Sequence, residues 1–129
     1  MTGLLAGLSV LVIEDDFYLA DDAREALEGA GAKVLGPISN AADALELLAC
    51  TRPDCALVDV NLGGGASFVS AEALQQRAVA FVFLTGYDAS TIPPRFASVP
   101  RLQKPLSKSA LLVALADVAA AERQKRPMR

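Results

Sequence analysis

Five polar side chains that could bind and transfer a phosphate group stand at the ends of short apolar runs. Glu14 and Asp15 follow the first run, Asp59 ends the third, Thr85 ends the fourth and Lys104 follows the fifth. Carboxylates bind cations and attack phosphorus, while hydroxyl and ammonium groups hold phosphate oxygens. These residues therefore predict phosphoryl chemistry, provided that the fold brings them together.

The three carboxylates predict a magnesium site. Carboxylates held close together repel one another, and a hard divalent cation relieves that repulsion by taking oxygen ligands. We expect Asp15 and Asp59 to bind Mg²⁺, with Glu14 acting through water and the backbone carbonyl of Asn61 adding an oxygen. A free oxygen of Asp59 would then be a nucleophile for a phosphoryl group.

Thr85 and Lys104 are expected to hold the oxygens of that phosphoryl group. Each residue alone also has a simpler explanation. Asp59 could form a turn, Thr85 and Gly86 could be turn residues, and Lys104 could be a solvated charge. Asp16 is better explained as a helix cap than as a metal ligand. The combination of carboxylate, hydroxyl and ammonium side chains at the ends of four strands favours the functional interpretation.

The elements that must position these residues follow from hydrophobic periodicity. Apolar runs typical of strands occupy residues 9–13, 33–36, 54–59, 79–84 and 101–103. Segments with helical spacing occupy 19–30, about 40–50, 70–77 and 110–124. Residues 86–100 contain Pro93, Pro94 and Pro100, so a helix there would be short or irregular.

Strands that alternate with helices predict an α/β fold, a doubly wound five-stranded parallel sheet with helices on both faces. For a small sheet of this kind we expect the strand order 2-1-3-4-5. Functional residues then lie at the carboxyl ends of strands 1, 3, 4 and 5, where the polar residues occur. At 129 residues the chain is predicted to form one domain, 1–121, followed by a basic tail, 122–129.

Composition excludes several classes of function. The chain has no histidine, which rules out a catalytic triad with histidine, a zinc site with histidine and a phosphohistidine within these residues. The net charge is −3 although residues 122–129 carry +3, so the rest of the chain carries −6. An acidic body of this kind is not expected to bind nucleic acid.

The sequence also predicts a cytoplasmic protein that does not enter a membrane. No basic amino-terminal region precedes an apolar stretch, so no signal peptide is expected. No apolar run approaches the roughly 20 residues that span a bilayer. Cys50 and Cys55 are expected to be reduced and buried, because two cysteines around Pro53 do not form a disulfide framework.

Four segments resemble the receiver domains of two-component response regulators. They are Val10–Asp16 (VLVIEDD), Leu57–Leu62 (LVDVNL), Phe83–Tyr87 (FLTGY) and Gln103–Leu106 (QKPL), and the resemblance covers about residues 8–121. It implies a flavodoxin-like fold, Asp59 as phosphoacceptor, and Mg²⁺ bound by Glu14, Asp15, Asp59 and Asn61. It also implies Thr85 as switch hydroxyl, Lys104 as phosphate-binding cation and a cis bond between Lys104 and Pro105.

The string Phe83–Tyr87 is similar to that of the "FAT GUY" subgroup of stand-alone bacterial receivers. In most receivers a small residue, often alanine, follows the switch hydroxyl, whereas here Gly86 follows Thr85 and Tyr87 comes next. Most receivers also have an aromatic residue three positions before the lysine, where this chain has Arg101. Gly63–Gly65 replace the usual proline-glycine turn. The switch is therefore expected to involve Thr85, Gly86, Tyr87 and Arg101, with Tyr87 taking the place of the missing aromatic residue.

The resemblance implies a single-domain response regulator. It would take a phosphoryl group from a sensor histidine kinase or a phosphotransfer protein and act through protein contacts, as a monomer or weak homodimer. It would not be an enzyme beyond Mg²⁺-assisted self-phosphorylation and autodephosphorylation. Two alternatives are a phosphorylation-independent binding module and a small phosphatase with Asp59 as nucleophile. A phosphatase would need a second acid two residues later, where Asn61 stands.

Overall fold

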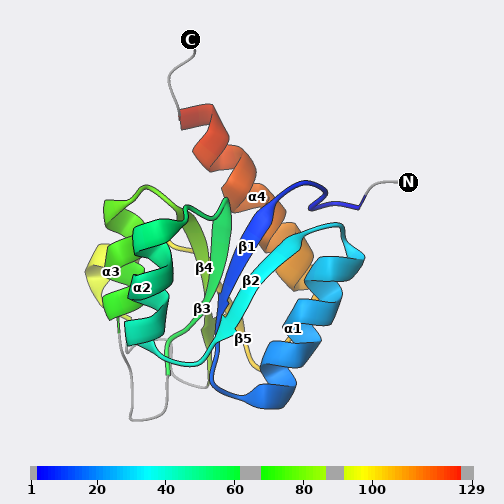
Figure 1. The fold of residues 1–129 in the computed structure, drawn as a ribbon, viewed down its shortest axis with the longest axis horizontal. Helices are drawn as coiled ribbons and strands as arrows, with labels where there is room; N and C mark the ends of the chain where they lie inside the picture. Colours follow the sequence, from blue (N-terminus) through cyan, green and yellow to red (C-terminus); the bar gives the residue numbers. More distant parts are fainter. Residues whose placement is uncertain (1–2, 62–67, 87–91, 126–129) are drawn as a thin grey trace.

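A computed structural model describes residues 3–61, 68–86 and 92–125 of the chain. It contains a five-stranded parallel sheet in the order β2-β1-β3-β4-β5 (Figure 1). The strands are β1 (Ser9–Ile13), β2 (Lys33–Ile38), β3 (Cys55–Asp59), β4 (Ala80–Thr85) and β5 (Arg101–Gln103). The helices are α1 (Phe17–Gly29), α2 (Ala41–Cys50), α3 (Val69–Gln76) and α4 (Lys108–Lys125). The predicted fold class and strand order are confirmed.

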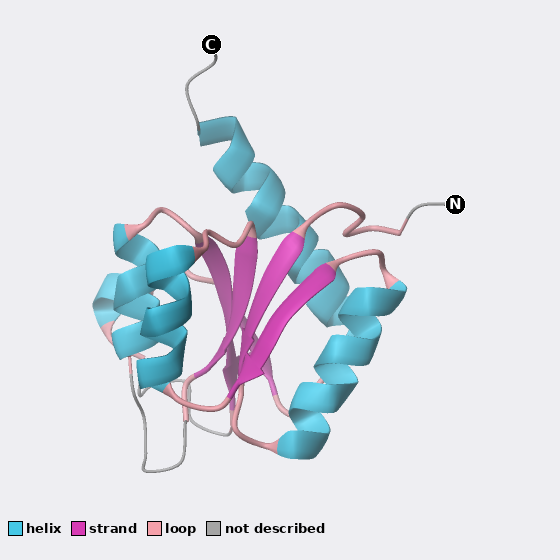
Figure 2. Cartoon of the chain, viewed as in Figure 1, coloured by secondary structure: helices cyan, strands magenta, loops and turns pink. Residues whose placement is uncertain are grey.

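Helices cover both faces of the sheet (Figure 2). On one face, α2 and α3 pack over a core that includes Phe81, Phe83 and Phe96. On the other face, α1 and α4 enclose a second core with Leu111 and Leu115. Cys55 is buried in this core as predicted, whereas Cys50 at the end of α2 is exposed, so that part of the prediction was wrong. The central strands β1, β3 and β4 are buried almost throughout. This explains their nearly unbroken apolar sequences, because a strand covered on both faces needs no polar side.

The connection between β4 and β5 is irregular, as its three prolines predict. Among the described residues of this connection, the one helical element is the 3₁₀ helix η2 (Pro94–Phe96). Phe96 is fully buried, and Arg95 lies over its ring while pairing with Glu72 of α3. These contacts fix the connection against the sheet.

Both ends of the described chain are part of the folded structure. Leu5, which precedes the first predicted strand, is fully buried, and its N–H donates to the carbonyl of Ala30 at 3.0 Å. At the other end, α4 continues to Lys125, one residue beyond the predicted helix end at residue 124. Residues 126–129 lie outside the described residues. None of the described helices is long and apolar enough to span a membrane.

Candidate functional site

The predicted site residues meet at the carboxyl ends of the parallel strands. Glu14 directly follows β1, Asp59 is the last residue of β3, Thr85 is the last residue of β4 and Lys104 follows β5. Neighbouring strands are in register here, since Asp59 pairs with Leu84. The N–H of Lys104 donates to the carbonyl of Thr85 at 2.8 Å, which continues the ladder beyond β5.

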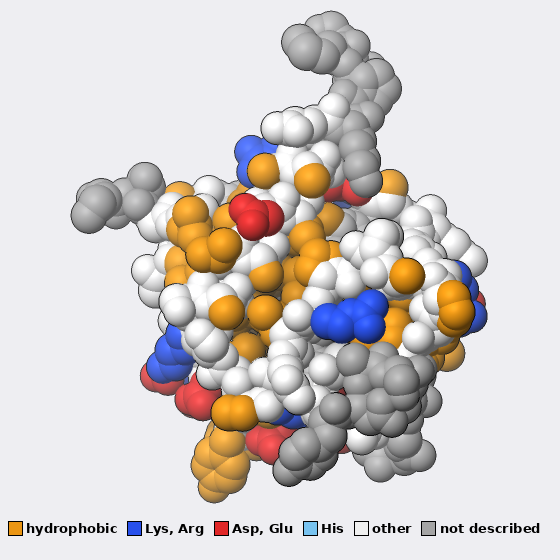
Figure 3. Space-filling view, turned by 180° about the vertical axis from the view of Figure 1, so that it is seen from behind, with side chains coloured by type: hydrophobic (Ala, Val, Ile, Leu, Met, Phe, Trp, Pro, Cys, Tyr) orange, Lys and Arg blue, Asp and Glu red, His pale blue; other side chains and the backbone are white. Residues whose placement is uncertain are grey.

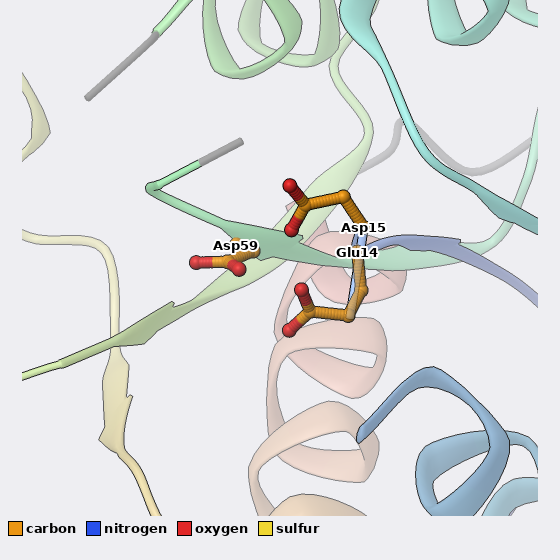
Figure 4. Close-up of side chains that lie close together, drawn as sticks. All are labelled: Glu14, Asp15 and Asp59. Atoms are coloured by element: carbon orange, nitrogen blue, oxygen red, sulfur yellow. The ribbon is translucent and has the colours of Figure 1, made fainter. Parts of the chain in front are cut away.

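Three carboxylates form an acidic cluster in this position. One oxygen from each of Glu14, Asp15 and Asp59 lies within 4.8 Å of the others, and Figure 4 shows the three side chains around one space. Glu14 and Asp59 are only 3% and 1% exposed, whereas Asp15 is exposed. The cluster therefore has two buried acids and one acid at the surface.

Lys104 is the cation that faces this cluster. Its Nζ donates to Asp59 Oδ2 at 3.1 Å and lies 3.9 Å from Glu14 Oε1. Partial burial lowers the pKa of Lys104, but the hydrogen bond to Asp59 and the charges of the three acids raise it by more, and the net change is upward. Lys104 is therefore a permanent positive charge beside Asp59.

Glu14 has the most perturbed acid–base behaviour in the site. Burial, together with the adjacent Asp59 carboxylate, raises the pKa of Glu14 to about 8. Its Oε2 accepts the backbone N–H of Asp16 at 3.1 Å, but its buried Oε1 has no hydrogen-bond partner among the described residues. A buried carboxylate oxygen without a partner, next to two further carboxylates, fits a hard cation such as Mg²⁺.

The raised pKa of Glu14 gives a prediction for the protein without metal. Between about pH 4.5 and 8 the folded state holds a proton on Glu14 that the unfolded chain has lost. The free energy of unfolding is therefore expected to fall as pH rises through this interval, by up to roughly 1.4 kcal/mol per pH unit. Urea denaturation at several pH values, in the presence of a chelator, measures this slope. Glu14→Gln should flatten it, and equal slopes in both proteins would contradict the prediction.

Asp16 and Asn61 contribute differently from the three carboxylates. Asp16 caps α1, since its side chain accepts the N–H of Leu19 at 3.0 Å, which confirms the simpler explanation for this residue. The backbone N–H of Asn61 donates to Asp59 Oδ1 at 2.9 Å. The backbone N–H groups of Asp16 and Asn61 thus orient Glu14 and Asp59. No residue type could have revealed this role, because every non-proline residue has such a group.

The predicted switch residues are only partly brought together. Thr85 is buried at the end of β4, and Gly86 is exposed directly after it. Arg101 begins β5, opposite the end that leads to Lys104, and its side chain is exposed. Tyr87 and Gly63–Gly65 lie outside the described residues. The predicted cis peptide bond between Lys104 and Pro105 is confirmed.

Comparison with known protein families assigns the chain to one of them. Residues 10–116 match the profile of the response regulator receiver domain. The chain belongs to this family. The match includes residues of all five strands and contains every predicted site residue. Among curated proteins, none matches this receiver significantly.

Three solved structures resemble this receiver over nearly their whole length. The signal receiver domain of a modulated diguanylate cyclase from Desulfovibrio desulfuricans G20 is 29% identical, with a TM-score of 0.81, covering 92% of this receiver and 98% of that chain. SdrG from Sphingomonas melonis Fr1 is 32% identical, with a TM-score of 0.74 and coverage of 95% and 99%. A CheY-like receiver from Methanospirillum hungatei JF-1, at 19% identity and a TM-score of 0.81, shares the fold over 92% of this receiver and 98% of that chain.

Proposed function

We propose that this receiver accepts a phosphoryl group on Asp59 from a sensor histidine kinase or a phosphotransfer protein. The observation that carries the proposal is the partly buried contact between Asp59 Oδ2 and Lys104 Nζ at 3.1 Å, next to two further carboxylates. A carboxylate with a fixed cation beside it can attack phosphorus while the cation holds the phosphoryl oxygens. The hydroxyl of Thr85, a buried residue at the end of the neighbouring strand, completes this set.

Glu14, Asp15, Asp59 and the carbonyl of Asn61 are the groups that would hold Mg²⁺. When bound, Mg²⁺ neutralises the charge of the acids and of the phosphoryl oxygens during transfer. The protein's own contribution is to hold Asp59 in place, through the N–H of Asn61 on Oδ1 and Lys104 on Oδ2. We expect Lys104 to move from the carboxylate to the incoming phosphoryl group.

The transfer step forms one bond and breaks one bond. A carboxylate oxygen of Asp59 attacks the phosphorus of a phosphohistidine, and the phosphorus–nitrogen bond to the imidazole breaks. The imidazole nitrogen keeps the electron pair and can take up a proton from solvent. The 129 residues contain no histidine, so the phosphohistidine lies outside them. Hydrolysis of the acyl phosphate by water returns the Asp59 carboxylate and releases phosphate.

We further propose that the receiver works in the cytoplasm and signals through protein contacts. A phosphoryl group adds about −1.5 to −2 charge beside Thr85, which changes the surface that a partner meets. Its chemistry is limited to its own phosphorylation and dephosphorylation, so it would not be an enzyme acting on other substrates. In solution we expect a monomer or a weak homodimer.

Incubation with acetyl phosphate tests the proposal. Intact mass and phosphate-affinity gel mobility are measured with Mg²⁺ and with a chelator in its place. We expect a gain of one phosphoryl group that depends on Mg²⁺. Because some receivers ignore small donors, beryllofluoride with Mg²⁺ is added to a parallel sample, and a spectral change is expected. If neither reagent has an effect, a phosphorylation-independent binding module becomes the better interpretation.

A further inference from the structure

A second candidate site lies at the amino end of β4, at the opposite end of the sheet from Asp59. A groove of about 430 Å³ opens between the start of β4, the segment Ser98–Pro100 and the carboxyl-terminal half of α4. The outer face of α4 is unusually apolar for an exposed helix, with Val113 53% exposed and Asp117 the one charged residue between Lys108 and Glu122. Figure 3 shows hydrophobic side chains gathered along this helix.

One edge of the groove is a stretch of β4 that β5 does not cover. The ladder between β4 and β5 begins only at Phe83, which pairs with Arg101 and donates its N–H to the carbonyl of Pro100 at 2.9 Å. Every second residue of a strand points its backbone N–H and carbonyl groups toward the same neighbouring strand. The N–H and carbonyl of Phe81 therefore face the same side as those of Phe83.

The backbone of Phe81 has no partner on that side within the part of the chain that the structure describes. The next ladder bond would run from the N–H of residue 100 to the carbonyl of Phe81, but Pro100 has no N–H. The N–H of Phe81 forms no backbone hydrogen bond to Ser98, the residue that would accept it in a continued ladder. A donor and an acceptor are thus left at the edge of the groove.

The walls of the groove show what kind of ligand would suit them. Val79, Val99 and Val118 supply apolar surface, whereas Asp117 and Glu122 carry the charges of the lining. Among the described residues, no lysine or arginine lines the groove, and neither acid forms an ion pair. The groove therefore combines apolar contact area, two negative charges and free backbone hydrogen-bonding groups.

We propose that this groove binds an extended peptide segment of a partner protein, with basic side chains beside apolar ones. The peptide backbone would bond to the N–H and carbonyl of Phe81, in the manner of strand addition at a sheet edge. Its apolar side chains would contact the valine walls, and its lysine or arginine side chains would pair with Asp117 and Glu122. The groove has no residue in common with the acidic cluster, so this proposal does not depend on phosphorylation.

Titration of the ¹⁵N-labelled protein with defined hexapeptides tests the proposal. The probe is acetyl-(Lys-Val)₃-amide, compared with acetyl-(Glu-Val)₃-amide and with a (Lys-Val)₃ peptide N-methylated at alternate residues. We expect the basic peptide to shift the amide signals of 79–81, 98–99 and 117–122. The acidic peptide should leave these signals in place, because its glutamate side chains are repelled by Asp117 and Glu122. The N-methylated peptide should bind more weakly, because it lacks half of the backbone donors.

Two matched variants check the role of the acids. Asp117→Asn combined with Glu122→Gln is expected to weaken binding of the basic peptide by about fivefold. Asp22→Asn combined with Glu25→Gln removes the same charge from the exposed face of α1 and should leave the affinity unchanged.

Four results would overturn the proposal. They are no shift at 79–81 with several millimolar basic peptide, shifts confined to other surfaces, equal binding of the acidic peptide, and equal affinity of both double variants. Sedimentation of the free protein adds a further check. A stable dimer that protects the signals of 79–81 would mean that a second copy of the chain, not a foreign peptide, covers the groove.

Discussion

Replacing Asp59 by asparagine is expected to abolish phosphoryl uptake while the protein stays folded. The asparagine amide has nearly the shape of the carboxylate but is a far weaker nucleophile, so no acyl phosphate should form. The fold should persist because asparagine has nearly the same volume, and because the substitution removes a negative charge from beside the buried Glu14 carboxyl group; Asp59 and Glu14 are 1% and 3% exposed. Intact mass after incubation with acetyl phosphate and Mg²⁺ measures the loss.

Asp16→Asn is the matched control for this experiment. It removes a carboxylate from the loop between β1 and α1, next to Asp15 of the acidic cluster, but the Asp16 side chain caps the first turn of α1 through the N–H of Leu19. Asparagine caps helices as well as aspartate does, so stability should change little. Phosphoryl uptake should continue in this variant. A phosphoryl group gained by Asp59→Asn would show that a different residue is the acceptor.

Replacing Phe96 by alanine is expected to cause the largest loss of stability. Phe96 is fully buried, and its ring lies 5.5 Å from that of Phe83 and 5.8 Å from that of Phe68, measured between centroids. Removing a buried phenylalanine side chain typically lowers the free energy of unfolding by about 3–5 kcal/mol, because it leaves a cavity. Urea denaturation of the variant and the unchanged protein gives this difference.

Phe17→Ala serves as the control, because Phe17 is 74% exposed at the start of α1. Its effect on the free energy of unfolding should stay within about 0.5 kcal/mol. If Phe96→Ala does not fold, Phe96→Leu keeps part of the buried volume and should lose less stability. A loss below about 1 kcal/mol for Phe96→Ala would mean that η2 does not hold the connection between β4 and β5 against the sheet.

Much of the site could be predicted because a parallel sheet orders its strand ends. Glu14, Asp59, Thr85 and Lys104 are up to ninety residues apart in the chain, yet each stands where an apolar run ends. Once the runs are strands of one parallel sheet, their carboxyl ends meet at one edge. The identity of each side chain then indicated its chemistry without any coordinates.

The prediction was weaker where structure depends on contacts between distant segments. Leu5 stands before the first strand in a stretch without periodicity, and only its burial beside Ala30 shows that it belongs to the core. The prolines before β5 predicted an irregular connection. They did not predict that Phe96 would be fully buried, because that depends on which phenylalanine rings of β4 lie opposite.

The sequence by itself determined the fold class and the residue types of the site, because periodicity and the residues at strand ends are local properties of the chain. The strand order was expected only as the one common to small sheets of this kind. Only the tertiary structure decided how the acids differ. Glu14 is buried with an oxygen that lacks a described partner, Asp15 is exposed, and Asp59 is paired with Lys104. The groove beside Phe81 also appeared only in the folded chain. Burial, pKa and unpaired backbone groups depend on distances between segments that the sequence does not bring together.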